Sequence, residues 1–122
     1  MEYFPDPASS VKVQDIISRL NLSHIDSSRV KTIRSRGSKS RVLARIHSVP
    51  KAVQTGLNLQ SHYVIEIVSE NFDRLSEDEK TKTLIHELLH IPKTFGGGLL
   101  PHTNHVTRKA IDRHYNIYLS TK

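Results

Sequence analysis

Two histidines four residues apart, His86 and His90, flank a glutamate in the segment His86-Glu87-Leu88-Leu89-His90. On a helix, residues at this spacing project from the same face, so both imidazoles can reach one zinc ion. Glu87 lies about 100° around the helix from His86, close enough to touch a water molecule on that metal. This spacing predicts the constellation of a zinc hydrolase in which a metal-bound water attacks and Glu87 acts as general base.

The residues before and after the motif predict a helix around it. The segment Ser76-Glu77-Asp78-Glu79 has the pattern of a capping box, and its acidic residues suit the positive end of the helix dipole. Pro92 disfavours helical backbone at the residue before it. We therefore expect a helix over residues 77–91, with His90 in its last turn. The alternative is an amphipathic helix with two surface histidines and no metal.

The identity of the third protein ligand decides the class of zinc site. Catalytic zinc usually has three protein ligands and a water molecule in the fourth position. No glutamate follows Glu87, which excludes the gluzincin pattern, and Gly96 stands where a metzincin has its third histidine. The remaining candidates are His102, His105, Asp112 and His114.

His102 is the preferred third ligand. Three consecutive glycines, 96–98, can take positive φ and let the chain double back after the helix, and Pro101 stiffens the approach of His102. The alternative for the glycine run is a plain flexible linker. His105 is the second choice; otherwise it could support a ligand or donate a hydrogen bond to the oxyanion. Tyr115 is another oxyanion candidate, although its spacing also fits the buried face of a last helix.

The segment HELLHIPKTFGGGLLPH, residues 86–102, resembles the metallopeptidases of archaea and phages, the phage metallopeptidase domain group. This group is similar to the SprT-like minimal zincins. The wider resemblance runs from about Ala44 to about Tyr118. It implies hydrolysis of a peptide or protein substrate, with Glu87 as catalytic base and one zinc ion held by His86, His90 and His102.

Two residues depart from the pattern of that group. Serine is common where Gly96 stands, and a basic residue is common where Leu100 stands. If the basic residue helps to hold substrate, Leu100 leaves that role vacant.

The composition sets limits on the fold and its surroundings. A chain of 122 residues forms one domain, and without cysteine its metal ligands must be histidine or carboxylate. No stretch approaches the length of a transmembrane helix, and residues 1–6 lack the features of a signal peptide. We expect no membrane partner and a location in the cytoplasm, or in the host cytoplasm if the protein is viral.

The hydropathy pattern predicts an α+β fold of the minimal zincin plan. Residues 1–9 are expected to form an irregular arm, and residues 10–122 a single domain. The helices are expected at 10–20, 50–57, 77–91 and 104–119, and the strands at 30–35, 42–49 and 62–69. A turn around Gly37-Ser38 would join the first two strands. The three strands would make a mainly antiparallel sheet behind the metal helix, and a peptide could pair with its edge.

Glu66 interrupts the otherwise apolar strand at 62–69. It could accept a hydrogen bond from a ligating histidine. A solvated side chain, or a partner for a nearby arginine, is the favoured interpretation.

A strongly basic segment suggests a second class of function. The net charge is +6 and the pI is about 9.8. No acidic residue lies between residues 27 and 65, whereas basic residues are frequent there. Such a hairpin could bind nucleic acid phosphates, but it has no interleaved aromatic residue for base stacking, and it could equally be a solvated surface. The alternative function is therefore a basic nucleic-acid-binding or interaction protein with a non-catalytic zinc site. The patch would consist of Arg29, Lys31, Arg34, Arg36, Lys39, Arg41 and Arg45.

Overall fold

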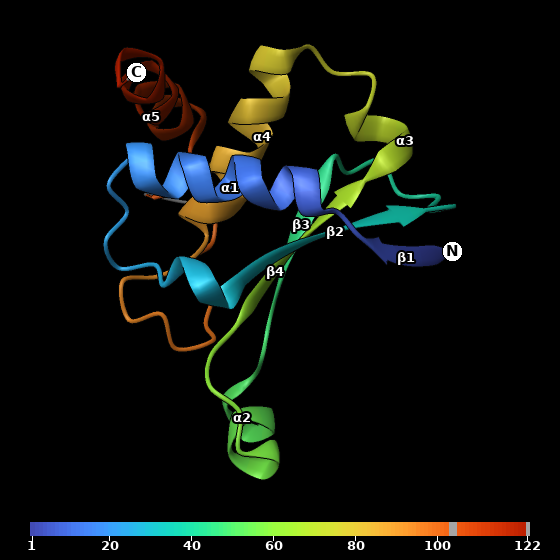
Figure 1. The fold of residues 1–122 in the computed structure, drawn as a ribbon, viewed down its shortest axis with the longest axis vertical. Helices are drawn as coiled ribbons and strands as arrows, with labels where there is room; N and C mark the ends of the chain where they lie inside the picture. The colour runs from blue at the N-terminus through green and yellow to red at the C-terminus, as the bar shows by residue number, and fades with distance from the viewer. Residues whose placement is uncertain (103–104, 122) are drawn as a thin grey trace.

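The fold, taken from a computed structural model that describes residues 1–102 and 105–121, is α+β, as the sequence predicts. Among these residues, five α-helices and a short 3-10 helix at Ser27–Arg29 accompany one sheet of four strands (Figure 1). The strands are β1 (Glu2–Pro5), β2 (Val30–Arg36), β3 (Ala44–Ser48) and β4 (Tyr63–Val68). The helices are α1 (Pro7–Arg19), α2 (Lys51–Leu57), α3 (Ser69–Phe72), α4 (Glu77–Leu89) and α5 (Arg108–Ser120).

The sheet differs from the expected three-stranded antiparallel arrangement. Its strand order is β1-β2-β4-β3, with β2 parallel to β4 and the other two pairs antiparallel. The predicted hairpin between the strands at 30–35 and 42–49 is therefore wrong, because β4 lies between β2 and β3. The nearly continuous apolar run of β4 explains its central place, since a central strand is buried on both faces.

The first nine residues are not an irregular arm. Residues 2–5 form β1, which pairs with β2, and α1 begins at Pro7 with Asp6 as its N-cap. Proline is tolerated in an edge strand and at the first position of a helix. A strand of four residues that ends at Pro5 is too short for a periodic signal, which is why the sequence pattern did not indicate it.

The metal-motif helix begins where the capping box predicts. The Ser76 side chain accepts from the Glu79 backbone, and the Glu79 side chain accepts from the Ser76 backbone. The helix ends at Leu89, slightly before the predicted end, and His90 is its C-cap. The last helix, expected from 104, begins at Arg108; residue 104 itself lies outside the described residues.

One face of the sheet carries the core. In Figure 1, α1 and α4 lie against the sheet, α5 lies beside α4, and α2 lies at the lower end. The apolar face of α4 packs here, and Thr83 and Glu87 of the same helix line a cavity beside the edge strand β3. The buried residues include Val13, Ile16, Tyr63, Ile65, Ile67, Leu84, Ile85 and Leu88. Across residues 1–102 and 105–121, no helix is both long and apolar enough to cross a membrane.

Candidate metal centre

Three histidine side chains converge where α4 ends. Nε2 of His102 lies 2.8 Å from Nε2 of His86 and 3.1 Å from Nε2 of His90. One ring nitrogen from each residue lies within 4.8 Å of the others. Within the described ranges, this is the one group of three or more histidine or carboxylate side chains close enough to hold a metal ion.

Hydrogen bonds alone do not explain this convergence. A neutral ring nitrogen has either one hydrogen or one lone pair, so Nε2 of His102 cannot satisfy both neighbours at once. Nδ1 of His90 donates to the carbonyl of Leu100, which leaves the lone pair of His90 on Nε2, facing the other rings. In a tetrahedral zinc site, bonds of about 2.0–2.1 Å place nitrogens roughly 3.3 Å apart, close to the spacing here. The donor set therefore fits a zinc ion.

Backbone contacts after α4 bring the third histidine to the other two. The N–H of Leu100 donates to the carbonyl of His90 at 2.7 Å, while the Leu100 carbonyl accepts from the His90 ring. These two bonds fold the chain back over the end of the helix and place Pro101-His102 beside it. The turn that precedes them uses positive φ at Phe95 and Gly97, +47° and +107°. The glycine run thus forms a defined turn and not a plain linker.

The three rings border a cavity of about 600 Å³ between α4 and the edge strand β3. Glu87 is the one carboxylate among its described lining residues. Most of the remaining lining is apolar and comes from β3, the segment before it and the loop that ends at His102. The lining residues are Val42, Leu43, Ala44, Arg45, Ile46, Thr83, His86, Glu87, His90, Leu99, Leu100, Pro101 and His102.

Burial shifts the proton affinities of the groups in this cavity. Glu87 is only 6% exposed, and burial raises the pKa of its carboxyl group to about 7. Burial, together with the nearby rings of His90 and His102, lowers the pKa of His86 to about 4. Burial also lowers the pKa of His90, against the effect of its bond to Leu100. At neutral pH the rings of His86 and His90 are therefore uncharged, as ligation requires, and Glu87 can both take and give a proton.

The other candidate ligands and oxyanion donors do not join this group. His105 and His114 line a different cavity, which Leu88 and Leu89 of α4 also line. Asp112 pairs with Lys82 at 3.3 Å.

Tyr115 is also engaged elsewhere. Its hydroxyl donates to Asp78 at the start of α4, and the residue does not line the cavity of the three histidines. Its predicted place on the buried face of the last helix is confirmed, since it is 8% exposed.

Glu66 does not support a ligating histidine. It is only 1% exposed, and its Oε1 accepts from Nε2 of His47 at 2.7 Å, with Nε of Arg45 3.6 Å away. Glu66 lies on β4, and its two partners lie on the neighbouring strand β3, where Arg45 is directly opposite Glu66. The interpretation as an arginine partner is confirmed, whereas a solvated side chain is wrong.

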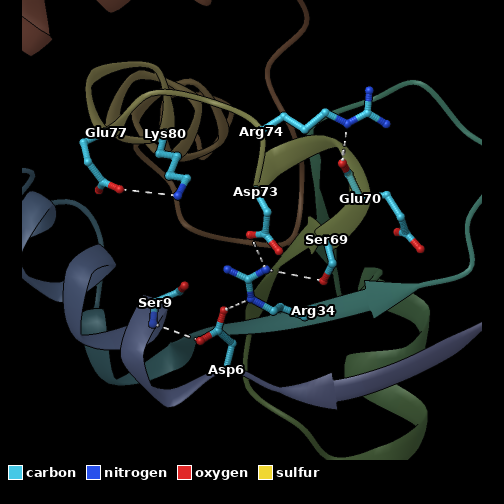
Figure 2. Close-up of polar contacts among 9 residues, drawn as sticks. All are labelled: Asp6, Ser9, Arg34, Ser69, Glu70, Asp73, Arg74, Glu77 and Lys80. Carbon is cyan, nitrogen blue, oxygen red and sulfur yellow. Dashed lines mark hydrogen bonds and ion pairs between the residues drawn. The ribbon is translucent and has the colours of Figure 1, made fainter.

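Several residues of the predicted basic patch instead stabilise the fold. Figure 2 shows Arg34 between Asp6 and Asp73, with its Nε 2.6 Å and its Nη1 2.8 Å from their carboxylates. Nη1 also donates to Ser69, so Arg34 links β2 to the start of α1 and to α3. Arg29 likewise pairs with Asp26 at 3.0 Å.

The remaining basic residues of the patch are exposed. Because the expected hairpin does not form, they are spread over β2 and the segment that leads to β3. They are Lys31, Arg36, Lys39 and Arg41.

Two contacts that build the site had no clear signal in the sequence. The Leu100 carbonyl orients His90, and because it is a backbone group, the type of residue at position 100 does not indicate this contact. The hydroxyl of Tyr63 reaches the glycine turn from β4. A tyrosine at an inward position of an apolar strand was the one hint, because a buried hydroxyl needs a partner.

The fold and the three histidines together define a small α+β protein with a candidate metal-binding site in a cleft. The chain belongs to the family described as "Putative phage metallopeptidase", whose sequence model matches residues 1–116. The resemblance to phage metallopeptidases noted in the sequence is thereby confirmed, and it extends to the first strand and helix. Searches of the curated proteins and of the solved structures found no match.

Proposed function

We propose that the protein is a zinc-dependent peptidase of the HExxH type. His86, His90 and His102 would hold one zinc ion, and Glu87 would act as the general base in hydrolysis of a peptide bond. The observation that carries this proposal is the meeting of three Nε2 atoms beside a buried carboxyl group in one cavity. Membership of a metallopeptidase family supports it.

The residues of the cavity suit the required proton transfers. Zinc, when bound, supplies a Lewis acid that polarises the scissile carbonyl and makes a water molecule more acidic. Glu87 would accept a proton from the attacking water and return it to the leaving amine. In the metal-free protein burial raises the pKa of Glu87 to about 7, and the charge of a bound zinc ion would favour the ionised form that acts as a base.

The cleft has room for an extended peptide that passes the histidines. In the described sheet β3 is an edge strand, so its outer backbone groups can pair with a substrate strand. On one side of the histidines the cavity is lined by apolar residues such as Ile46, Leu99 and Leu100. A second cavity also borders His86 and His102, and its lining combines charged residues, among them Lys82, Arg108 and Asp112, with apolar ones. We therefore expect an apolar side chain on one side of the scissile bond.

The test compares the zinc-loaded protein with its Glu87→Gln variant on casein, with fragments identified by mass spectrometry. The variant should bind zinc in the same amount and lose at least about a hundredfold in turnover. His105→Ala is the matched control and should retain activity. Hydrolysis that is undiminished in Glu87→Gln would reject the general-base role. Cleavage sites without apolar neighbours would reject the predicted specificity.

A second candidate is a basic nucleic-acid-binding or interaction protein with a non-catalytic zinc site. The exposed Lys31, Arg36, Lys39 and Arg41 and the net charge of +6 favour it. This function predicts DNA binding that weakens as the salt concentration rises and that persists after zinc is removed. Against it, a structural zinc site fills its fourth position with protein, and the described group contains three histidines and no fourth ligand.

A further inference from the structure

The hydroxyl of Tyr63 joins the central strand of the sheet to the glycine turn. Tyr63 is the first residue of β4 and is fully buried. Its oxygen accepts from the N–H of Gly97 at 2.9 Å and donates to the carbonyl of Gly98 at 2.8 Å. Phe95 packs edge-on against the ring, with centroids 5.0 Å apart. One side chain of the sheet thus fixes the backbone of two successive residues of the turn.

The turn runs so close to its surroundings that its path has little freedom. A Cβ at Gly97 would lie 2.6 Å from both Nε2 of Gln54 and the carbonyl of Val49. The same Gln54 nitrogen donates to the carbonyls of Val49 and Gly96, at 2.7 and 3.0 Å. A Cβ at Gly98, by contrast, would meet nothing within 4 Å. Gly97 therefore marks the point where the turn is pressed against Val49 and α2.

The fixed turn leads directly to the third histidine. Soon after Gly98, Leu100 bonds twice to His90, and His102 follows Pro101. The position of His102 therefore depends on two anchors, one at Tyr63 and one at His90. Without the first anchor, the turn would have to be ordered when the metal binds, and that ordering would reduce affinity.

We propose that Tyr63 is a positioning residue for the metal centre. Its hydroxyl holds the glycine turn so that His102 meets His86 and His90 before any metal is bound. This role rests on the proposed function, because it takes His102 as a metal ligand. Supports of this kind, one contact away from a ligand, typically change metal affinity by about 10–100-fold when removed.

The test measures zinc affinity of the full-length protein by competition with a chromogenic chelator, at a temperature where every variant is folded. Tyr63→Phe removes only the hydroxyl, and zinc binding should weaken about tenfold or more. Tyr118→Phe is the matched control. Tyr118 is also buried, and its hydroxyl bonds to Lys12 and Asp15, away from the turn. The Tyr118→Phe variant should be less stable than the parent protein, but its zinc affinity should stay within about twofold of the parent's. Equal affinities for the two variants would overturn the proposal.

A second pair of variants makes the test independent of how well Tyr63→Phe folds. Gly97→Ala should weaken zinc binding, because the added Cβ must displace the turn, whereas Gly98→Ala should not. Equal zinc affinities in this pair would overturn the proposal too. His102→Ala separates this role from the proposed function. If His102→Ala leaves zinc affinity unchanged, the ligand set itself is wrong. If it weakens zinc binding but Tyr63→Phe and Gly97→Ala do not, only the positioning role fails.

Discussion

Replacing Glu87 by glutamine should stabilise the metal-free protein at pH 8. The residue is 6% exposed, and no ion pair to it occurs within the described part of the chain. Burial raises its pKa from an ordinary 4.5 to about 7. At pH 8 the folded protein must therefore hold an ionised carboxylate where the surroundings disfavour charge. Glutamine keeps the size of the side chain and removes that charge.

The magnitude follows from the pKa shift. One pKa unit corresponds to about 1.36 kcal/mol, so a rise from 4.5 to about 7 lowers the free energy of unfolding by about 3 kcal/mol at pH 8. Between the two values the folded state binds more protons than the unfolded state, so stability falls as the pH rises through that window. Near pH 5 most of this penalty is gone, and the benefit of Glu87→Gln should shrink to about 1 kcal/mol or less.

The assay is urea unfolding in the presence of a chelator, at pH 8 and at pH 5. Glu77→Gln is the matched control, because Glu77 lies on the same helix with a side chain that is 91% exposed. That control should change the free energy of unfolding by no more than about 0.5 kcal/mol at either pH. A loss of stability in Glu87→Gln at pH 8, or a gain of the same size at both pH values, would refute the reasoning.

Two further predictions concern the third ligand and the basic residues. His102→Ala should weaken zinc binding, measured by chelator competition, far more than His105→Ala does; the reverse order would make His105 the ligand. Arg34→Met should lower the free energy of unfolding by about 3 kcal/mol, because Asp6, whose side chain is only 10% exposed, loses its partner. Lys31→Met, at an exposed site on the same strand, should change it by less than about 0.5 kcal/mol. Equal losses in urea unfolding would contradict this account of Arg34.

The metal helix could be predicted from the sequence because its signals are local. The capping box fixes its start, Pro92 limits its end, and the four-residue spacing puts His86 and His90 on one face. Two elements with a clear apolar period could also be predicted: β4 lies where expected, and α1 does so except that it begins at Pro7, before its predicted start at residue 10. In each case the residues that decide the structure are neighbours in the chain.

The contacts between distant segments could not be predicted in the same way. The order of the sheet depends on β4 inserting between β2 and β3, and two adjacent strands in the sequence look the same whether or not they pair. The basic run likewise gave no sign that Arg34 meets Asp6 and Asp73, or that Arg45 meets Glu66. Such acidic partners lie far along the chain from their arginines, so a charge pattern alone overestimates the exposed positive surface.

The position of His102 depends both on local sequence signals and on contacts between distant segments. Glycines and a proline before it indicated that the chain could double back, but not where it would lead. Its position comes from backbone bonds between Leu100 and His90 and from the Tyr63 hydroxyl on β4. Residue types gave the candidate, and tertiary contacts decided among the alternatives.

The most direct test of the account is a high-resolution crystal structure of the zinc-loaded protein. It should show one zinc ion with Nε2 of His86, His90 and His102 at about 2.0–2.1 Å and a water molecule in the fourth position. The carboxylate of Glu87 should lie within about 2.6–3.2 Å of that water. A protein atom in the fourth position, or a Glu87 side chain directed away from the metal, would contradict the assignment as a peptidase.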